Sequence, residues 1–119
     1  MLGSIGLVPL TCLVCVSAMA ELPPRPVNTY SIVARDADTG EMGVAVQSHW
    51  FSVGSVVAWV APGVGAVATQ SFVQPEYGPL GLELMRAGKS ASQALSALIG
   101  IDEYAAMRQV GMVDANGGC

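Results

Sequence analysis

Basic side chains are scarce in this sequence. Its 119 residues include five lysines and arginines and nine aspartates and glutamates, and the formal net charge is -4. The five cations are scattered along the chain and nowhere form a cluster. A surface that follows a nucleic-acid backbone needs clustered Lys and Arg to neutralise the phosphates. The sequence therefore predicts that nucleic acid is not a partner.

Cysteine and histidine are also too few for a metal centre or a disulfide framework. The three cysteines are Cys12, Cys15 and Cys119, and His49 is the single histidine. The first two cysteines lie in a segment that we expect to be removed on export, which leaves one thiol. A structural zinc site alone uses about four such ligands. We therefore expect no metal, no cofactor and no disulfide, and a fold held together by burial alone.

The beginning of the chain shows features of a secretory signal. An apolar run over residues 5–16 is followed by Ala18-Met19-Ala20, whose small residues at 18 and 20 match a signal-peptidase site. The run is too short to span a membrane comfortably. No Lys or Arg precedes it, so the basic region that usually opens a signal peptide is missing. The pattern still favours export.

These features divide the chain into three parts. We predict a signal peptide at residues 1–20, a leader with three prolines at 21–28 and a domain at 29–119. The domain is expected to be secreted or periplasmic, without membrane contact once the signal has been removed. The alternative interpretation is a misassigned start codon upstream of a soluble protein.

Apolar stretches rich in Val, Ala and Gly, separated by turn signals, fill the segment that follows the leader. They predict strands at 29–35, 42–48, 55–60 and 64–69. Because these strands contain few polar residues, we expect a sheet that is buried on both faces. The polar residues are confined to the strand ends, where a rigid scaffold would hold them. They are Thr29, Ser48, His49, Thr69, Gln70 and Ser71.

Two helices are predicted after these strands. Pro79 is suited to the first turn of a helix, and Gly88 is suited to its end. Ser90 and Gln93 have the spacing of a capping box that opens a second helix. Each segment has an apolar stripe and little charge, so we expect both helices to lie against the sheet.

A fifth strand is predicted at 107–113, followed by a turn that contains Asn116-Gly117. No returning strand follows this turn. A sheet that is buried on both faces also needs cover on its second side, which two helices cannot supply. We therefore expect this chain to be only the N-terminal half of a longer domain.

Three segments together resemble one protein family. They are residues 29–57 (TYSIVARDADTGEMGVAVQSHWFSVGSVV), 63–95 (GVGAVATQSFVQPEYGPLGLELMRAGKSASQAL) and 108–117 (RQVGMVDANG). They closely resemble domain of unknown function 1028, a family similar to N-terminal-nucleophile hydrolases, over essentially residues 29–119. The resemblance implies an α+β fold, a four-layer αββα sandwich in which two sheets lie between helices, as in proteasome β subunits. Members of this family usually continue beyond the point where this sequence ends.

The resemblance also implies a chemistry. In such hydrolases a Thr, Ser or Cys at the amino terminus attacks an amide carbonyl, and its α-amine, with a pKa of about 7.7–8.0, takes the proton. Thr29 matches the residue that follows the initiator Met in many family members. Cleavage after Ala20 would leave Glu21 at the amino terminus, so a second cut between Asn28 and Thr29 is required. The expected substrate is a small amide or peptide-like molecule.

Further site residues come from the same resemblance. His49 would supply a cation that lowers the pKa of the nucleophile, where relatives carry His or commonly Lys. The backbone N–H of Gly65 would donate to the oxyanion, because a glycine lets the backbone approach the substrate closely. Substrate-binding residues are expected among the remaining strand-end positions, namely Ser48, Thr69, Gln70 and Ser71.

Ordinary structural roles fit several of these residues equally well. Thr29 also suits a β-former that opens a strand, and His49 suits a hydrogen-bonded group beside aromatic residues. Thr69, Gln70 and Ser71 could instead satisfy the backbone at a strand end. We interpret the aromatic residues as core or sheet-packing groups rather than as a substrate wall. They are Trp50, Phe51 and Trp59.

Two classes of function follow from these observations. The first is an amidohydrolase of the N-terminal-nucleophile type. The second is a non-catalytic ligand-binding or assembly module that kept the sandwich and lacks a free amine at Thr29. The residue at the mature amino terminus distinguishes the two. The sequence leaves open whether the protein forms a homo-oligomer.

Overall fold

The structure is a computed structural model that describes residues 28–119. The predicted signal peptide at 1–20, and the leader up to residue 27, lie outside the described residues. Among the described helices, none has both the length and the hydrophobicity that a membrane crossing requires. Within the same range, no group of three or more His, Cys, Asp or Glu side chains is placed to hold a metal ion.

The chain begins with an antiparallel hairpin, as predicted. Strand β1 (Tyr30–Arg35) pairs with β2 (Met42–Gln47), in a register that places Tyr30 opposite Gln47. Asp36 shapes the turn between them, because its Oδ1 accepts hydrogen bonds from the backbone N–H groups of Asp38 and Thr39, both at 2.8 Å. The local turn signals of the sequence were therefore sufficient to predict this hairpin.

A second antiparallel sheet contains three strands. It consists of β3 (Ala58–Ala61), β4 (Gly65–Ser71) and β5 (Arg108–Asp114), in the order β3-β4-β5. Residues 65–69 of the central strand β4 are all buried, which agrees with the prediction of a strand that is covered on both faces. This strand is therefore the centre of the described domain.

The predicted strand at 55–60 is wrong in its first half. Residues there form α1 (Gly54–Val57), a single helical turn, and β3 begins only at Ala58. The backbone N–H groups of Val56 and Val57 donate to the carbonyl oxygen of Val53, at 3.1 and 3.0 Å. These local hydrogen bonds outweigh the preference of valine for a strand, which depends on context.

Two longer helices follow β4, as predicted. Helix α2 (Tyr77–Arg86) begins before Pro79, because the N–H groups of Tyr77 and Gly78 donate to the carbonyl oxygens of Gln74 and Pro75. Helix α3 (Ala91–Ile99) follows a left-handed Gly88 with φ of 90°. The predicted capping box is confirmed.

That capping box has both of its hydrogen bonds. The Ser90 hydroxyl accepts from the N–H of Gln93, and the Gln93 side chain accepts from the N–H of Ser90.

A short 3-10 helix, η1 (Ala105–Met107), precedes β5, so the fifth strand begins one residue later than predicted.

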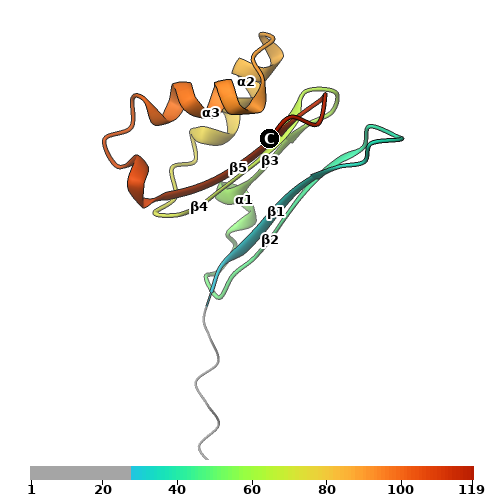
Figure 1. The fold of residues 1–119 in the computed structure, drawn as a ribbon. Helices are drawn as coiled ribbons and strands as arrows, with labels where there is room; N and C mark the ends of the chain where they lie inside the picture. Colours follow the sequence, from blue (N-terminus) through green and yellow to red (C-terminus); the bar gives the residue numbers. More distant parts are fainter. Residues whose placement is uncertain (1–27) are drawn as a thin grey trace, which may run out of the picture.

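The described residues form three layers (Figure 1). Helices α2 and α3 lie on one face of the β3-β4-β5 sheet, and the β1–β2 hairpin lies on the other face. The hydrophobic core lies between the helices and the three-stranded sheet. Its buried members are Val67, Tyr77, Leu82, Met85, Ala91, Ala94, Leu98 and Met112.

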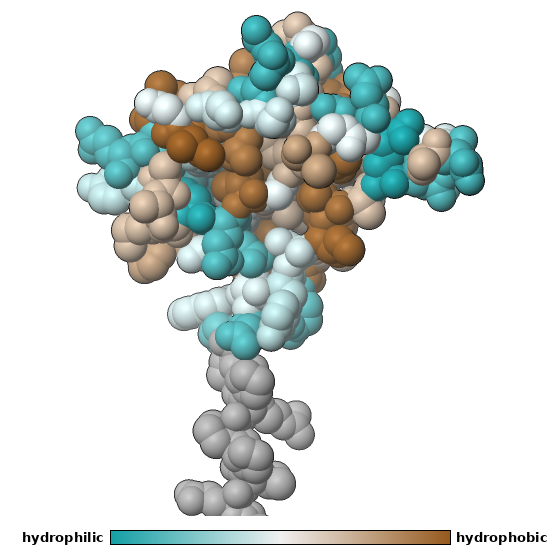
Figure 2. Space-filling model, in the orientation of Figure 1, coloured by the Kyte–Doolittle hydropathy of each residue, from teal (hydrophilic) through white to brown (hydrophobic). Residues whose placement is uncertain are grey.

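The hairpin differs from the prediction that the strands are buried on both faces. Burial alternates along β1 and β2, and the outward-facing Tyr30 and Ile32 are 60% and 63% exposed. Only the inner face of the hairpin is covered, by the three-stranded sheet. Hydrophobic side chains accordingly reach the surface between hydrophilic ones on the face drawn in Figure 2.

Asp114, at the end of β5, joins this strand to α3 and to the turn that follows. Its side chain is buried, at 5% exposure. Oδ2 accepts a hydrogen bond from the N–H of Ala91 at 2.9 Å, and Oδ1 accepts from the N–H groups of Asn116 and Gly118, both at 2.9 Å. The bond from Ala91 first, and then those from Gly118 and Asn116, hold the pKa of this carboxyl group below its ordinary value.

We expect Asp114→Asn to lower the free energy of unfolding at neutral pH by about 1–3 kcal/mol, because an amide nitrogen cannot accept from these buried N–H groups. The deficit should shrink in acid. Since the carboxyl pKa is lower in the folded than in the unfolded state, its stabilisation is present above about pH 3.9 and is lost as the pH falls through the folded value. Urea unfolding over a pH series measures both effects, with the exposed turn variant Asp38→Asn as control. Equal stability of Asp114→Asn and wild type at neutral pH would contradict this role.

Gly78 allows α2 to lie directly on β3. It is buried, and a Cβ atom built on it would overlap the indole ring of Trp59 at Cγ and Cδ1. Gly54 in α1 is also helical, but a Cβ atom there would meet nothing within 4 Å. The two glycines therefore form a matched pair for testing close packing.

We expect Gly78→Ala to destabilise the fold by about 1–3 kcal/mol, because overlap with the indole outweighs the higher helix propensity of alanine. Gly54→Ala should change the stability by less than about 0.5 kcal/mol. Thermal unfolding followed by circular dichroism compares the two. If Gly78→Ala melts at or above the wild-type temperature, the proposed contact with Trp59 does not limit the packing.

Candidate functional site

Four of the predicted site residues line one pocket, with a volume of about 240 Å³. They are Thr29, Ser48, Gln70 and Ser71. They come from the start of β1, the end of β2 and the end of β4, which meet at the same end of the two sheets (Figure 1). The remaining lining residues are mostly apolar: Trp50, Val53, Val56, Val57 and Val73.

Two hydroxyl groups meet in this pocket. Thr29 Oγ1 and Ser48 Oγ lie 2.8 Å apart and share a hydrogen bond. Ser48 Oγ also accepts from the backbone N–H of Trp50 at 3.1 Å, which fixes the serine side chain. The hairpin register explains why these two residues meet. Tyr30 lies opposite Gln47, and Thr29 precedes Tyr30 whereas Ser48 follows Gln47, so the two residues lie opposite each other just beyond the last ladder pair.

Gln70 connects the two sheets beside this hydroxyl pair. Its Nε2 donates to the carbonyl oxygen of Thr29 at 3.3 Å and to Oε1 of Gln109 on β5 at 2.9 Å. The amide oxygen of Gln70, Oε1, is buried and has no hydrogen-bond partner among the described residues. Gln70 therefore anchors the backbone of Thr29 and leaves one buried acceptor next to it.

Strained backbone is found at the same place. Ser71 and Ser52 have φ of 75° and 54°, and they are the only non-glycine residues with positive φ in the part of the chain that the structure describes. Ser71 lines the pocket, and Ser52 directly precedes Val53 in its wall. Such conformations cost on the order of 1–3 kcal/mol and cluster at functional sites. The strain marks this end of the sheets as a candidate site.

The predicted cationic residue lies at the surface. His49 is exposed, and its ring lies beside that of Trp50, with the centroids 5.0 Å apart and the planes tilted by 43°. The chain runs directly from Ser48 to His49, so the imidazole lies near the pocket but does not line it.

Two predicted residues are not brought to Thr29. Gly65 lies five residues before Gln70 on β4, a separation of about 16 Å in a strand. It is buried, and a Cβ atom there would lie 2.6 Å from the carbonyl oxygen of Val113. Thr69 is fully buried, and its hydroxyl donates to the carbonyl oxygen of Gln74 at 3.4 Å. Thr69 thus satisfies the backbone of the loop before α2.

The aromatic residues differ from one another. Trp59 packs against the core, as interpreted from the sequence. Trp50 is 70% exposed and lines the pocket, and Phe51 is 99% exposed, so the interpretation of these two as core residues is wrong. They lie in the loop after β2, three and four residues beyond Gln47. Their position just after Ser48 and His49 was the signal that sequence reasoning could have used.

Comparisons with known proteins agree with this fold. The model of a family of unknown function, DUF1028, matches residues 29–119. The fold is similar to the crystal structure of protein SPO2555 from Silicibacter pomeroyi, whose description places it in the same family, with 28% sequence identity and a TM-score of 0.71. The similarity covers 76% of this chain and 40% of the Silicibacter chain.

The comparison with curated proteins gives no match. The family match extends over the whole domain predicted after the leader, and the similar solved structure belongs to the same family. From Thr29 to its last residue, the chain belongs to DUF1028, a family of unknown function.

Proposed function

We propose that this protein is an amide hydrolase of the N-terminal-nucleophile type, and that Thr29 is its nucleophile. The observation that carries the proposal is the hydroxyl pair of Thr29 and Ser48, 2.8 Å apart, in a pocket with apolar walls. A hydroxyl nucleophile needs a base and a defined position, and hydrolysis needs control over access of water. The pocket supplies the position and the walls, and the α-amine of Thr29 would supply the base.

The reaction requires cleavage of the bond between Asn28 and Thr29. The freed α-amine then takes the proton of the Thr29 hydroxyl, with the Ser48 hydroxyl holding the Thr29 oxygen in line. Oγ1 attacks the amide carbonyl of the substrate, and the C–N bond breaks as the leaving amine receives the proton. Water, deprotonated by the same α-amine, then hydrolyses the resulting ester and restores Thr29.

Gln70 supports this role by fixing the backbone of the nucleophile. Its bond to the Thr29 carbonyl crosses from one sheet to the other, so the two sheets together position Thr29. A group held in advance of the reaction loses less entropy when the transition state forms. Gly65 is left out of the proposal, because it lies at the other end of β4.

We extend the proposal to the fold and the location of the domain. The helix layer and the two sheets are compatible with three layers of an αββα sandwich, and the exposed Ile32 supports a further layer over the outer face of the hairpin. The apolar run at 5–16 with its small residues at 18 and 20 supports export to a secreted or periplasmic location. A small amide or peptide-like molecule is the proposed substrate.

The alternative is a non-catalytic binding module. In a chain that is still joined at the Asn28–Thr29 bond, the nitrogen of Thr29 belongs to an amide, and the Asn28 side chain donates to the Tyr30 hydroxyl at 3.1 Å. An amide nitrogen cannot act as the base. The state of this bond in the mature protein therefore decides between the two functions.

We expect the active protein to begin at Thr29 and Thr29→Ala to have no amide hydrolase activity, because the covalent route is then lost. Thr39→Ala, in the exposed hairpin turn, is the matched control and should retain activity. A panel of small acyl anilides, followed by liquid chromatography with mass detection, measures hydrolysis, and intact mass gives the amino terminus. Activity in protein whose Thr29 is still joined to Asn28 would exclude the mechanism.

Ser48→Ala and His49→Ala should reduce the rate without abolishing it. Loss of one group that stabilises the reacting oxygen typically costs about 10²–10³-fold in rate, and we expect this for Ser48→Ala, which removes a direct contact. His49 has no such contact, so His49→Ala should cost less. The rate of each variant should rise with pH as the α-amine deprotonates, around its ordinary pKa of about 7.7–8.0. If Ser48→Ala is as active as wild type, the hydroxyl pair has no role in the reaction.

A further inference from the structure

A second pocket lies on the opposite side of the three-stranded sheet from the hairpin, where α2 begins, α3 ends and β5 begins. Its volume is about 380 Å³. Leu80, Leu98 and Ile101 form an apolar wall, of which Leu80 is 42% and Ile101 is 81% exposed. Large apolar side chains that remain exposed beside a pocket are typical of binding sites. The wall offers a surface for the apolar part of a ligand.

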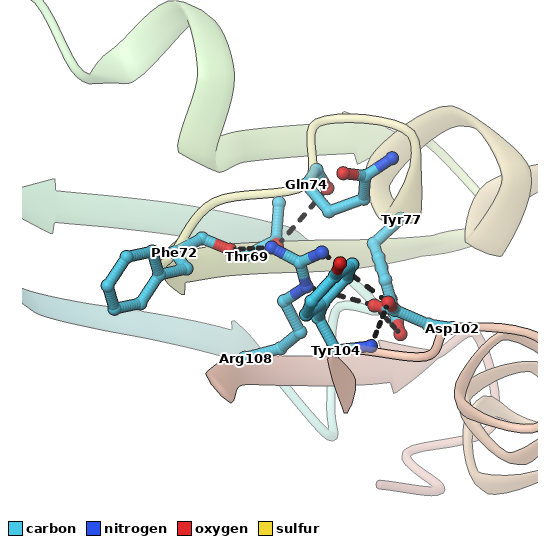
Figure 3. A network of polar contacts seen from close by, with 7 residues as sticks. All are labelled: Thr69, Phe72, Gln74, Tyr77, Asp102, Tyr104 and Arg108. Carbon is cyan, nitrogen blue, oxygen red and sulfur yellow. Dashed lines mark hydrogen bonds and ion pairs between the residues drawn. The ribbon is translucent and has the colours of Figure 1, made fainter. Parts of the chain in front are cut away.

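An ion pair forms the polar side of this pocket (Figure 3). Arg108 Nε donates to Asp102 Oδ2 at 2.9 Å, both side chains are 13% exposed, and the guanidinium also donates to the carbonyl oxygen of Phe72. Asp102 further accepts from the Tyr77 hydroxyl at 3.0 Å and from the N–H of Tyr104 at 2.8 Å. Arg108 first, and then these donors, lower the pKa of Asp102 to about 2. The charge of Arg108 is therefore largely neutralised by Asp102.

The remaining charge at the pocket is negative. Glu76 and Glu103 line it and are exposed, and Arg108 is the single cation among the described residues that line it. Neither glutamate takes part in an ion pair within residues 28–119, where the one salt bridge is that of Arg108 with Asp102. Because that pair cancels its own charge, the two glutamates give the mouth of the pocket a negative potential.

An aromatic ring stands beside these carboxylates. Tyr104 is 60% exposed and lines the same pocket. The guanidinium carbon of Arg108 lies 5.9 Å from the centroid of this ring, so part of the ring faces that cation and the exposed remainder is the surface that a ligand can meet. Carboxylates, an aromatic ring and an apolar wall within one pocket are the features that recognise an organic ammonium group.

We infer that this pocket binds a small amine, with its ammonium group near Glu76, Glu103 and Tyr104 and its apolar body on the wall formed with Ile101. An anion of the same shape would be repelled by both glutamates, and each nitrogen of the Arg108 guanidinium already donates to Asp102 or to the carbonyl oxygen of Phe72. A neutral molecule of the same shape would gain only the apolar contact. The pocket therefore distinguishes ligands by charge as well as by shape.

Three probes of similar size and shape test this inference: 2-phenylethylamine, 2-phenylethanol and 3-phenylpropionate. Each is titrated into the purified chain at neutral pH, and nuclear magnetic resonance follows the backbone amides of Ile101 to Tyr104. We expect the amine to shift these amides and to bind several-fold more tightly than the alcohol, with the carboxylate weakest. Added salt should weaken the binding of the amine and leave that of the alcohol unchanged.

Charge-neutral variants locate the effect. Glu76→Gln and Glu103→Gln should each lower the affinity for the amine by about two- to five-fold, as expected for an exposed charge pair, without changing the affinity for the alcohol. Glu83→Gln removes an exposed carboxylate from α2 outside the pocket, and it should change neither affinity. Ile101→Ser should lower the affinity for the amine and for the alcohol by similar factors. Ile99 on α3 is also exposed, and Ile99→Ser serves as the control.

The inference is overturned by equal binding of amine and alcohol, by tighter binding of the carboxylate, or by no shift with any probe at millimolar concentration. It is also overturned if Glu83→Gln lowers the affinity for the amine as much as Glu103→Gln does, because the attraction would then come from the net charge of the chain. Melting curves of all variants show that their fold is unchanged. None of these results depends on the state of the Asn28–Thr29 bond.

Discussion

Close packing on both faces of β4 sets the geometry of the described domain, because this strand pairs with β3 and β5 and is covered by helices on one side and by the hairpin on the other. Its residues Ala66 and Val67 are fully buried. Such a strand tolerates only small or compact apolar side chains. The composition of residues 65–68 follows from this constraint, and Gly78 meets the same demand where α2 lies on Trp59 of β3.

The same strand explains where a site can form. Polar side chains cannot occupy the middle of β4 without burial, so the partly accessible polar side chains of this strand lie at its end, at Gln70 and Ser71. There the hairpin contributes Thr29 and Ser48, and Gln109 of β5 bonds to Gln70. The two sheets thus share a polar cluster at one edge.

Much of the fold could be predicted because the signals are local. The turn at Asp36, the glycine after α2 and the capping box at Ser90 depend on a few neighbouring residues, and the structure has all three. Helix α1 was missed, because valines at 56 and 57 favour a strand unless the preceding loop offers a carbonyl acceptor. The exposure of the outer face of the hairpin was not predicted, because the burial of a strand depends on which other layers pack against it.

At the site, too, features set by neighbouring residues could be predicted, and features set by the packing of layers could not. Pairing of Thr29 with Ser48 follows from the hairpin, since residues that extend two paired strands lie opposite each other. The distance of Gly65 from Thr29 could not be read from the sequence, because it depends on how the two sheets are stacked. Trp50 was interpreted as a core or sheet-packing residue, whereas it is exposed in the loop that follows β2.

The position of Thr29 just outside the strand ladder has a consequence for maturation. The first cross-strand pair of the hairpin is Tyr30 with Gln47, so neither Asn28 nor Thr29 contributes a ladder pair. A cut between these two residues would remove no interstrand hydrogen bond, and the new charged terminus would appear at an edge rather than inside a layer. If the chain is cut at this bond, as we propose, the pairing of β1 with β2 does not depend on the cut, because the hairpin ladder is the same before and after it.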